Sequence, residues 1–280
     1  MSDLEGLVYG LDDPVYRAIE GLSSTEAKEL LKSPAHYQWY KSNPPVYKPE
    51  YDTGSAVHWF VLGAGSEPVV IPEDVLSKTG TIGTAAAKQF IQDSRDNGQI
   101  PMKQADLDYA KRIADAVTSD ANARALFSNG QPEVSMFGTD PETGVRMKGR
   151  LDWLSTRIVD LKTTAGSASE HDFAKDAFNR GYHVQYGWYT HLYELITGDT
   201  LPWLFVVVEK NGPFNIGIHR FGEDEILIGR HEARKALRRY ARAIETGHWP
   251  GYTTRSGGPI GVLLAPTWNI NEYIDGKDSE

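Results

Sequence analysis

Two aspartates and a lysine in the middle of the chain are spaced so that a β-hairpin would bring them together. Asp160 and Lys162 are separated by one residue, and because side chains alternate along a strand, they share one face of it. A turn centred on Thr156 would place Asp152 directly opposite Asp160 on the neighbouring strand. The Cβ atoms of such a pair lie about 5 Å apart.

Two carboxylates in that position repel each other, and like charges that face each other destabilise a sheet by up to about 1 kcal/mol. A divalent cation removes this repulsion. Mg²⁺ binds one or two carboxylates together with water and the oxygens of substrate phosphates, and we expect Mn²⁺ to substitute for it. Lys162 would then lie beside the metal, where an ammonium group can orient a water molecule or stabilise charge developing on a phosphate.

An exposed hairpin with solvated charges is the alternative, and Lys162 would then form an ordinary surface ion pair. The neighbouring residues favour the buried arrangement, because both stretches are apolar around the charged positions. Buried charges are seldom left without a partner. The apolar neighbours are Trp153, Leu154, Ile158, Val159 and Leu161.

Two residues outside the hairpin could add ligands to this site. His58 lies in the apolar stretch Ala56–Leu62, where it is either a core histidine with one hydrogen bond or, as a neutral imidazole, a further metal ligand. Glu133 opens the first predicted strand and is either a surface glutamate or a second carboxylate for a metal.

A polar pair lies on a predicted helix downstream of the hairpin. Gln185 and Tyr189 are four residues apart and share one helical face. They are either solvated or hold a phosphate backbone beside the metal. The opposite, core-facing stripe is formed by Val184, Trp188, Leu192 and Leu195.

Periodicity predicts the elements that would position these residues. Capping residues and amphipathic spacing favour helices in the first half of the chain, and alternating apolar runs favour strands after Gly130. This order predicts a single α/β domain with a mixed sheet. The predicted helices are a capped helix after Ser23 that ends before Pro34, Thr53–Gly63, Thr84–Asn97, Gln104–Ser119, Ala121–Phe127, Glu170–Asn179, Tyr182–Thr197 and Glu223–Thr246. The predicted strands are Glu133–Gly138, Val145–Leu154, Arg157–Thr163, Trp203–Glu209 and Asn215–Phe221, the last two joined by a turn at Asn211-Gly212.

Composition excludes several classes of protein. The 280 residues include no cysteine, which rules out disulfide scaffolds, zinc ribbons, cysteine nucleophiles and iron–sulfur clusters. With 29 Lys+Arg against 38 Asp+Glu the net charge is −9, which disfavours a protein that coats nucleic acid but not an enzyme with a local basic groove. No apolar run reaches the roughly 18 residues of a membrane-spanning helix, and the acidic N-terminus does not resemble a secretion signal, so we expect a cytoplasmic protein without a membrane partner.

Four motifs, taken in order, resemble those of the PD-(D/E)XK nuclease superfamily. They are Gly54–His58, Gly149–Trp153, Asp160–Thr164 and the pair Gln185 and Tyr189. The branch that they resemble most contains the phage and prophage recombination exonucleases of the RecE (exodeoxyribonuclease VIII) type. The segments Ser33–Tyr37 and Gly247–Tyr252 also resemble that branch, so the likeness covers about residues 20 to 265 and leaves an irregular C-terminal tail.

The resemblance implies a fold and a set of roles. The fold is a single exonuclease domain over residues 1–280, with a restriction-endonuclease-like core in which helices flank a mixed central sheet. Asp160 stands where many members have Glu, which shifts the metal. The implied metal ligands are Asp152 and Asp160, with contributions from the Leu161 carbonyl, His58 and Glu133. The implied catalytic residues are Asp152, Asp160, Lys162 to position the attacking water, and Gln185 and Tyr189 to line the DNA cleft.

The resemblance also implies an activity. The chain would digest one strand of linear duplex DNA from its ends in the 5′→3′ direction, with Mg²⁺, and expose 3′ single strands for an annealing protein of the RecT or Bet type. Members form homo-oligomeric rings, which would hold DNA in spite of a negative net charge, and they act in the bacterial cytoplasm, some encoded by phages or prophages. Another nuclease of the superfamily, such as a Cas4-like enzyme or an endonuclease, and a catalytically silent DNA-binding ring protein are the alternatives.

Basic residues near the motifs are candidates for DNA contacts. Those predicted to bind phosphates are Lys148, Arg150, Lys175 and Arg180. A second basic set recurs every four residues on the last helix, and it is either a solvated face paired with residues such as Glu232, a wall of a DNA channel, or a subunit contact. It consists of Arg230, Arg234, Arg238 and Arg242, with Lys235 and Arg239 beside them.

Overall fold

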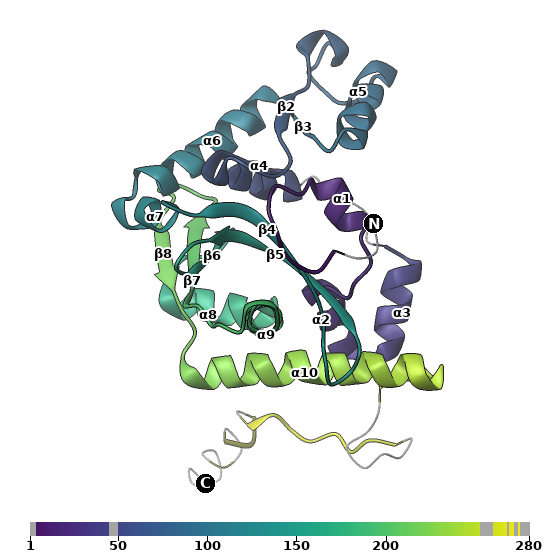
Figure 1. Cartoon of the computed structure of the whole chain (residues 1–280). Coiled ribbons are helices and arrows are strands. Elements are labelled where there is room, and N and C mark those ends of the chain that lie inside the picture. Colours follow the sequence, from purple (N-terminus) through teal and green to yellow (C-terminus); the bar gives the residue numbers. More distant parts are fainter. Residues whose placement is uncertain (1–3, 45–49, 253–259, 268, 272–273, 275–280) are drawn as a thin grey trace.

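A six-stranded mixed sheet forms the centre of the fold, in the order β1-β4-β5-β6-β7-β8 (Figure 1). The computed structural model describes residues 4–44, 50–252, 260–267, 269–271 and 274. Only β6 and β7 pair in parallel, and the other neighbours are antiparallel, which confirms the predicted α/β class with a mixed sheet. The strands are β1 (Gly6–Val8), β4 (Gln131–Thr139), β5 (Arg146–Leu154), β6 (Ile158–Thr164), β7 (Trp203–Glu209) and β8 (Ile216–His219).

The β5–β6 turn sets the register of the site. Trp153 pairs with Val159 and Leu154 with Ile158, so the turn is centred on Thr156, as the sequence predicts. β6 then leads through two helices into β7, because a parallel neighbour needs a long crossover.

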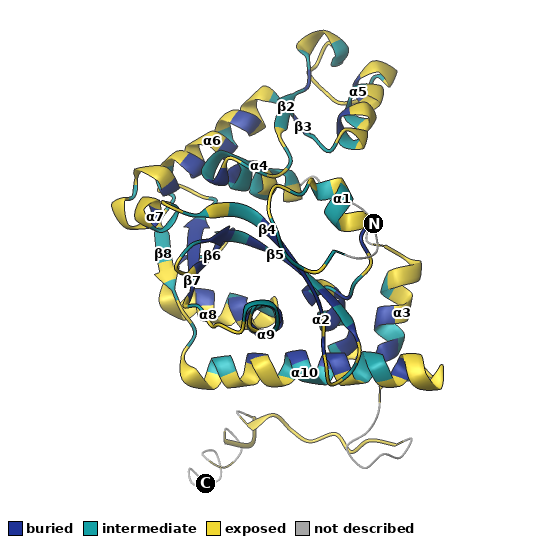
Figure 2. Ribbon diagram, viewed as in Figure 1, coloured by how far each residue is buried: buried dark blue, intermediate teal, exposed yellow. Residues whose placement is uncertain are grey.

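Helices cover both faces of the sheet (Figure 1). The buried residues follow this division, with one core cluster on each face, and Figure 2 shows the dark blue positions gathered on the strands and the inner helix surfaces. Alternation along β6 serves both clusters, since Ile158 belongs to the first core and Val159 and Leu161 to the second. On the side of the first core lie α2 (Ser24–Lys32), α3 (Pro34–Ser42), α8 (Glu170–Asn179), α9 (Tyr182–Thr197) and α10 (Glu223–Thr246). On the other lie α4 (Glu50–Leu62), α6 (Gln104–Ser119) and α7 (Ala121–Leu126).

Short elements at the edges are absent from the sequence-based prediction. All of them except α3 are three to six residues long, too brief to show a clear periodicity. A two-stranded parallel sheet, for example, lies between the predicted helices Thr53–Gly63 and Gln104–Ser119. The additional elements are β1, α1 (Asp13–Ala18), α3, β2 (Pro68–Val70), the 3₁₀ turn Glu73–Val75 and β3 (Ile100–Met102). The predicted helix at Thr84–Asn97 is α5 (Ala85–Asp96).

Two glycines let α9 and α10 cross in direct backbone contact. A Cβ atom at Gly187 would lie 2.2 Å from the carbonyl oxygen of Gly229, and one at Gly229 would lie 2.2 Å from that of His183. No side chain fits between the helices at this point. The crossing therefore fixes α9, which carries Gln185 and Tyr189, against the long α10.

The two outer segments that resemble the recombination exonucleases meet in space. The Trp249 ring stacks on Tyr37 with 5.5 Å between centroids, and the Ala35 N–H donates to the Pro250 carbonyl at 3.1 Å. This contact joins the first half of α3 to residues that follow α10. Residues 253–259 lie outside the described residues. Of the predicted irregular tail, residues 260–266 have no regular secondary structure, whereas 267, 269–271 and 274 are helical.

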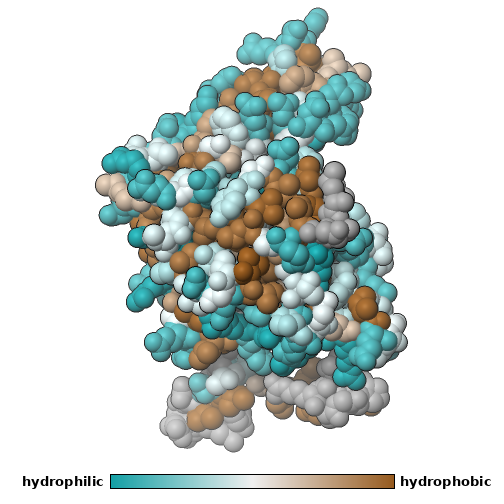
Figure 3. Space-filling model, in the orientation of Figure 1, coloured by the Kyte–Doolittle hydropathy of each residue, from teal (hydrophilic) through white to brown (hydrophobic). Residues whose placement is uncertain are grey.

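The surface shown in Figure 3 is largely hydrophilic, with a hydrophobic area near α1. None of the helices in the described part of the chain combines the length and the hydropathy that a transmembrane segment requires.

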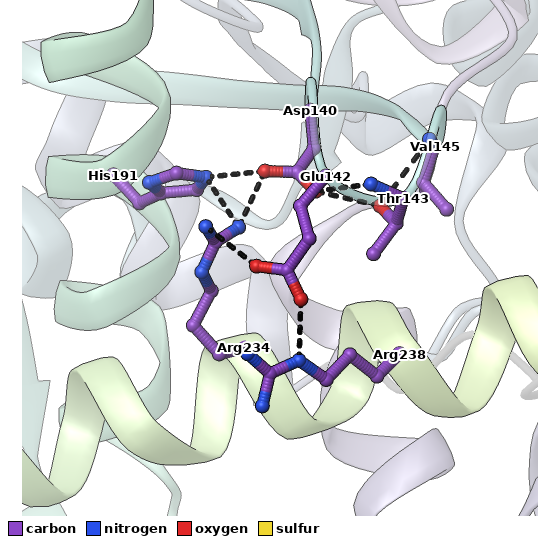
Figure 4. A network of polar contacts seen from close by, with 7 residues as sticks. All are labelled: Asp140, Glu142, Thr143, Val145, His191, Arg234 and Arg238. Carbon is purple, nitrogen blue, oxygen red and sulfur yellow. Dashed lines mark hydrogen bonds and ion pairs between the residues drawn. The ribbon is translucent and has the colours of Figure 1, made fainter.

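Arginines of the basic helix α10 form ion pairs with carboxylates of the β4–β5 turn (Figure 4). Arg234 Nη1 lies 2.5 Å from the buried Asp140 carboxylate, and Arg238 Nε lies 2.6 Å from Glu142. His191 Nε2 is 2.9 Å from the same Asp140 oxygen. The network ties the β4–β5 turn to α9 and α10, so these arginines serve the fold.

The Asp140 network predicts a stability difference that depends on pH. Burial raises the pKa of Asp140, but hydrogen bonds from Thr143, His191 and Arg234 outweigh it and lower the pKa to about 2. A carboxyl group whose pKa is lowered in the folded state stabilises that state at pH values above its pKa in the unfolded chain. This stabilisation is lost as the pH falls towards 2. We expect Asp140→Asn to lose about 2 kcal/mol of unfolding free energy at pH 7. Urea unfolding at several pH values checks this, and a difference from wild type that does not shrink between pH 4 and pH 2 contradicts it.

Candidate active site

Three carboxylates lie side by side across the neighbouring strands β4, β5 and β6. Glu133 lies between Pro132 and Val134, which pair with Trp153 and Leu151, so it stands opposite Asp152. Asp160 follows Val159, the partner of Trp153, and so stands opposite Asp152 on the other side. The sheet thus gathers acids that are far apart in the sequence.

The β5–β6 ladder opens at this level. Its paired residues end at Trp153 and Val159, and beyond them the Leu161 N–H donates to Asp152 Oδ2 at 2.8 Å. Leu151 and Leu154 belong to the same core although they are three residues apart, so the alternation of β5 breaks around Asp152. The break turns the Asp152 carboxylate towards α4, where His58 Nδ1 lies 3.7 Å from its Oδ2.

His58, Glu133 and Asp152 form a cluster that could hold a metal ion. One ligand atom from each lies within 4.8 Å of the others. Burial and then the Lys162 charge lower the pKa of His58 to about 4, so its imidazole is neutral at pH 7 and has a free lone pair. Burial and then the Asp152 charge raise the pKa of Glu133 to about 7. A divalent cation would relieve this crowding of negative charge, so the donor set fits such an ion.

Asp160 and Lys162 form a separate, deeper pair. Lys162 Nζ lies 2.5 Å from Asp160 Oδ2, and Gln185 Nε2 donates to Asp160 Oδ1 at 2.9 Å. Only 2% of the Asp160 side chain is exposed. Burial opposes the charge of Lys162, but the carboxylates of Asp160 and Asp152 outweigh it and raise the pKa of Lys162, which is an ammonium at neutral pH. Asp160 therefore lies outside the cluster of three donors, and its role as a metal ligand stays a prediction.

Two tyrosines of α9 pack against this pair and its strand. Lys162 Nζ lies 4.8 Å from the centre of the Tyr182 ring, within the range of a cation–π contact. A Cβ atom at Gly149 would lie 3.0 Å from the Tyr189 ring, so the glycine of the Gly149–Trp153 motif makes room for Tyr189. Gln185 and Tyr189 thus face the sheet and are half-buried.

A cleft of about 480 Å³ opens over the donor cluster. His58 and Glu133 line it, and four cationic side chains stand around them. This combination of acidic floor and basic wall suits a phosphate that must approach a cation. The cationic lining residues are Arg17, Arg150, Arg180 and Lys210. Asp13 and Tyr51 also line the cleft, and Asp13 pairs with Arg17 at 2.6 Å and with Arg150 at 3.4 Å.

The predicted DNA contacts have different surroundings. Lys148 Nζ donates to the carbonyl of Ile19 at 2.7 Å, and Arg150 donates to the carbonyl of Leu11 at 2.6 Å. Arg180 lines the cleft, and Lys175 is exposed on α8 away from it. Their role in binding DNA stays a prediction.

Sequence reasoning missed part of the site. Arg17, Tyr51, Lys210 and Tyr182 were not singled out, although Tyr182 contacts the predicted lysine and the other three line the cleft. For Arg17 a signal existed, since Asp13-Pro14 is a typical start of a short helix. For Tyr182 nothing in the local pattern distinguishes it from a core residue.

Comparison with known proteins agrees with this geometry. Residues 23–257 match the family described as "PDDEXK-like domain of unknown function (DUF3799)". The chain belongs to this PDDEXK-like family. Its fold is also that of a solved structure, the crystal structure of a "putative exonuclease" from Eubacterium rectale, with a TM-score of 0.61 and 18% identity over 95% of this chain and 98% of the other. None of the curated proteins matches the chain.

These findings support the PD-(D/E)XK superfamily, which the motifs predicted, and the mixed sheet flanked by helices. At 18% identity the solved structure shows a shared fold alone. The narrower RecE-like assignment stays a prediction.

Proposed function

We propose that this PDDEXK-like protein is a metal-dependent nuclease that hydrolyses phosphodiester bonds of DNA. One observation carries the proposal: His58 and Glu133 of the donor cluster line a cleft that also has four cationic side chains, and Asp152 and the Lys162 ammonium lie beside them. The family match is consistent with it.

The three clustered side chains, and Asp160 beside them, would hold Mg²⁺. When bound, such an ion stabilises negative charge on a phosphate and lowers the pKa of water. Two carboxylates and a neutral imidazole are ligands that a divalent cation accepts, although Mg²⁺ favours oxygen over nitrogen.

The chain's own residues then bind and orient the substrate. Lys162 is a fixed cation that stabilises the charge developing on the phosphate and positions the attacking water. Asp160 and Tyr182 hold the ammonium in place, and Gln185 holds Asp160. Arg17, Arg180 and Lys210 on the cleft wall face the phosphates of the bound strand.

The finer activity follows from the resemblance of the motifs. We propose digestion of linear duplex from its ends, 5′→3′, to expose 3′ single strands for an annealing protein in recombination. A homo-oligomeric ring in the cytoplasm of a bacterium, from a phage or prophage gene, would reconcile the net charge of −9 with retention of DNA.

End-labelled linear duplex and covalently closed circular duplex test the proposal together. With Mg²⁺ we expect the linear DNA to shorten from its ends and the circle to stay intact. Cleavage of the circle would identify an endonuclease instead, and no cleavage with either Mg²⁺ or Mn²⁺ would indicate a silent DNA-binding protein. The position of the label that is released first gives the polarity.

Tyr182 should act as a positioning residue through its ring. Tyr182→Phe keeps the ring beneath Lys162, and Tyr182→Leu removes it. A cation–π contact contributes about 0.5–2 kcal/mol, so we expect Tyr182→Leu to lower kcat by about tenfold and Tyr182→Phe to retain most activity. KM for DNA should change little in both. Equal losses in the two variants would show that the hydroxyl, and not the ring, matters.

A further inference from the structure

A second cavity, the basic pocket, lies between the start of α3 and the end of α10. Its volume is about 420 Å³, and Lys32, Arg239, Arg242 and His248 line it, with no carboxylate among the described residues of its lining. This is unusual for a chain with a net charge of −9. We infer that the basic pocket binds phosphate groups of a nucleic-acid strand that runs along α2 from the active cleft, an inference that rests on the proposed function.

Side chains, and not the helix terminus, supply the binding groups. The free N–H groups at the start of α3 are used within the chain, since Ala35 donates to Pro250 and His36 to Ser33. Arg239 donates to the carbonyls of Leu30 and Leu31 and forms a wall of the pocket.

The remaining cations are available to a ligand to different degrees. Lys32 forms an ion pair with Glu29, with 2.8 Å between Nζ and Oε1. Arg242 and His248 form no ion pair within the described part of the chain, and both are exposed. These two are therefore the side chains free to take a phosphate.

A row of cations connects the basic pocket to the active cleft. Arg180 lines the cleft, and Lys28 of α2 donates to its carbonyl at 3.3 Å. Lys32 follows Lys28 by one helical turn, so it stands next to it on the same face of α2. Cations repeated along a path match a backbone with repeated phosphates, whereas a single small anion needs only one of them.

An exposed aromatic ring at the mouth of the pocket suits a nucleic acid. Tyr252 is 82% exposed, and its ring lies 5.3 Å from that of His36. Bases of a single strand stack on such rings regardless of sequence. Phosphate contacts beside a stacking surface thus favour a single strand over an acidic peptide, which would use the cations alone.

Charge reversal at the pocket tests the inference by binding, without cleavage. The variant is Arg242→Glu, and the matched control is Arg157→Glu, an exposed arginine in the β5–β6 turn that forms no ion pair among the described residues. Fluorescence anisotropy in EDTA compares a long labelled single strand with a trinucleotide that fills only the cleft. Thermal unfolding verifies that both variants fold.

We expect Arg242→Glu to weaken binding of the long strand by about tenfold at low salt and to make the salt dependence less steep by about 0.7 for each lost phosphate contact. Binding of the trinucleotide, and of both DNAs to Arg157→Glu, should be unchanged. An equal loss for both lengths, or no loss at all, would overturn the inference.

Titration with inorganic phosphate tests the alternative that the pocket binds a free phosphate ion and not the backbone of a nucleic acid. If phosphate alone protects the wild type but not Arg242→Glu against unfolding, while the long strand binds both equally, the pocket is a site for a free anion and the strand path is wrong. The proposed function can fail on its own. If the wild type cleaves no DNA but Arg242→Glu still weakens binding of the long strand alone, the inference about the pocket stands and the proposed nuclease activity is wrong.

Discussion

Replacing Lys162 with methionine should lower the rate of DNA cleavage by about a thousandfold. The ammonium lies beside the donor cluster, and the Asp160 carboxylate and Tyr182 ring hold it in place. Methionine preserves much of the side-chain volume but has no charge to stabilise the reacting phosphate. The measurement is the single-turnover rate on linear duplex with saturating Mg²⁺.

The same substitution leaves Asp160 buried without its cation, so the folded state must be checked. Removing one partner of a buried ion pair costs about 3–5 kcal/mol, less where the remaining carboxyl takes up a proton. Thermal unfolding and DNA binding in EDTA therefore accompany the rate, and binding should stay within a few-fold of wild type. A folded Lys162→Met protein that cleaves at the wild-type rate would remove Lys162 from the mechanism.

Replacing Asp152 with asparagine should strongly weaken metal binding at the site and DNA cleavage with it. The carboxylate is common to the contacts with His58 and Leu161, and asparagine can still accept the Leu161 N–H that now reaches Asp152 Oδ2. The strand arrangement should therefore survive while one negative ligand is lost. We expect metal affinity to fall by about a hundredfold or more and the cleavage rate by at least about a thousandfold.

Calorimetry with Mg²⁺ and Mn²⁺ measures the affinity, and gel analysis of linear duplex measures the rate. Asp115→Asn on the exposed face of α6 makes the same chemical change far from the cluster and should match the wild type. Unaltered metal binding by Asp152→Asn would show that the ion lies elsewhere, with Asp160 as the first candidate.

The local sequence pattern was sufficient to predict the helices and strands that carry the motifs. The capping box at Ser23 and Glu26 forms as predicted, with the Ser23 N–H donating to Glu26 at 2.8 Å. The alternation of β6 places Asp160 and Lys162 on one face, and the turn centred on Thr156 brings Asp152 to the same level of the neighbouring strand, although the ladder opens there. These features depend on residues within about one turn or one hairpin of each other, which is the range over which periodicity and capping act.

The sequence by itself thus determined the type of fold, the order of its main elements and the hairpin at the centre of the site. Tertiary structure alone decided the partners of each charge. Glu133 and His58 lie beside Asp152 in one cluster. Asp160 pairs with Lys162 and accepts a hydrogen bond from Gln185, and Arg234 pairs with Asp140. Whether a charged side chain holds a ligand or a neighbour depends on burial and on groups from distant segments, and no local spacing encodes these.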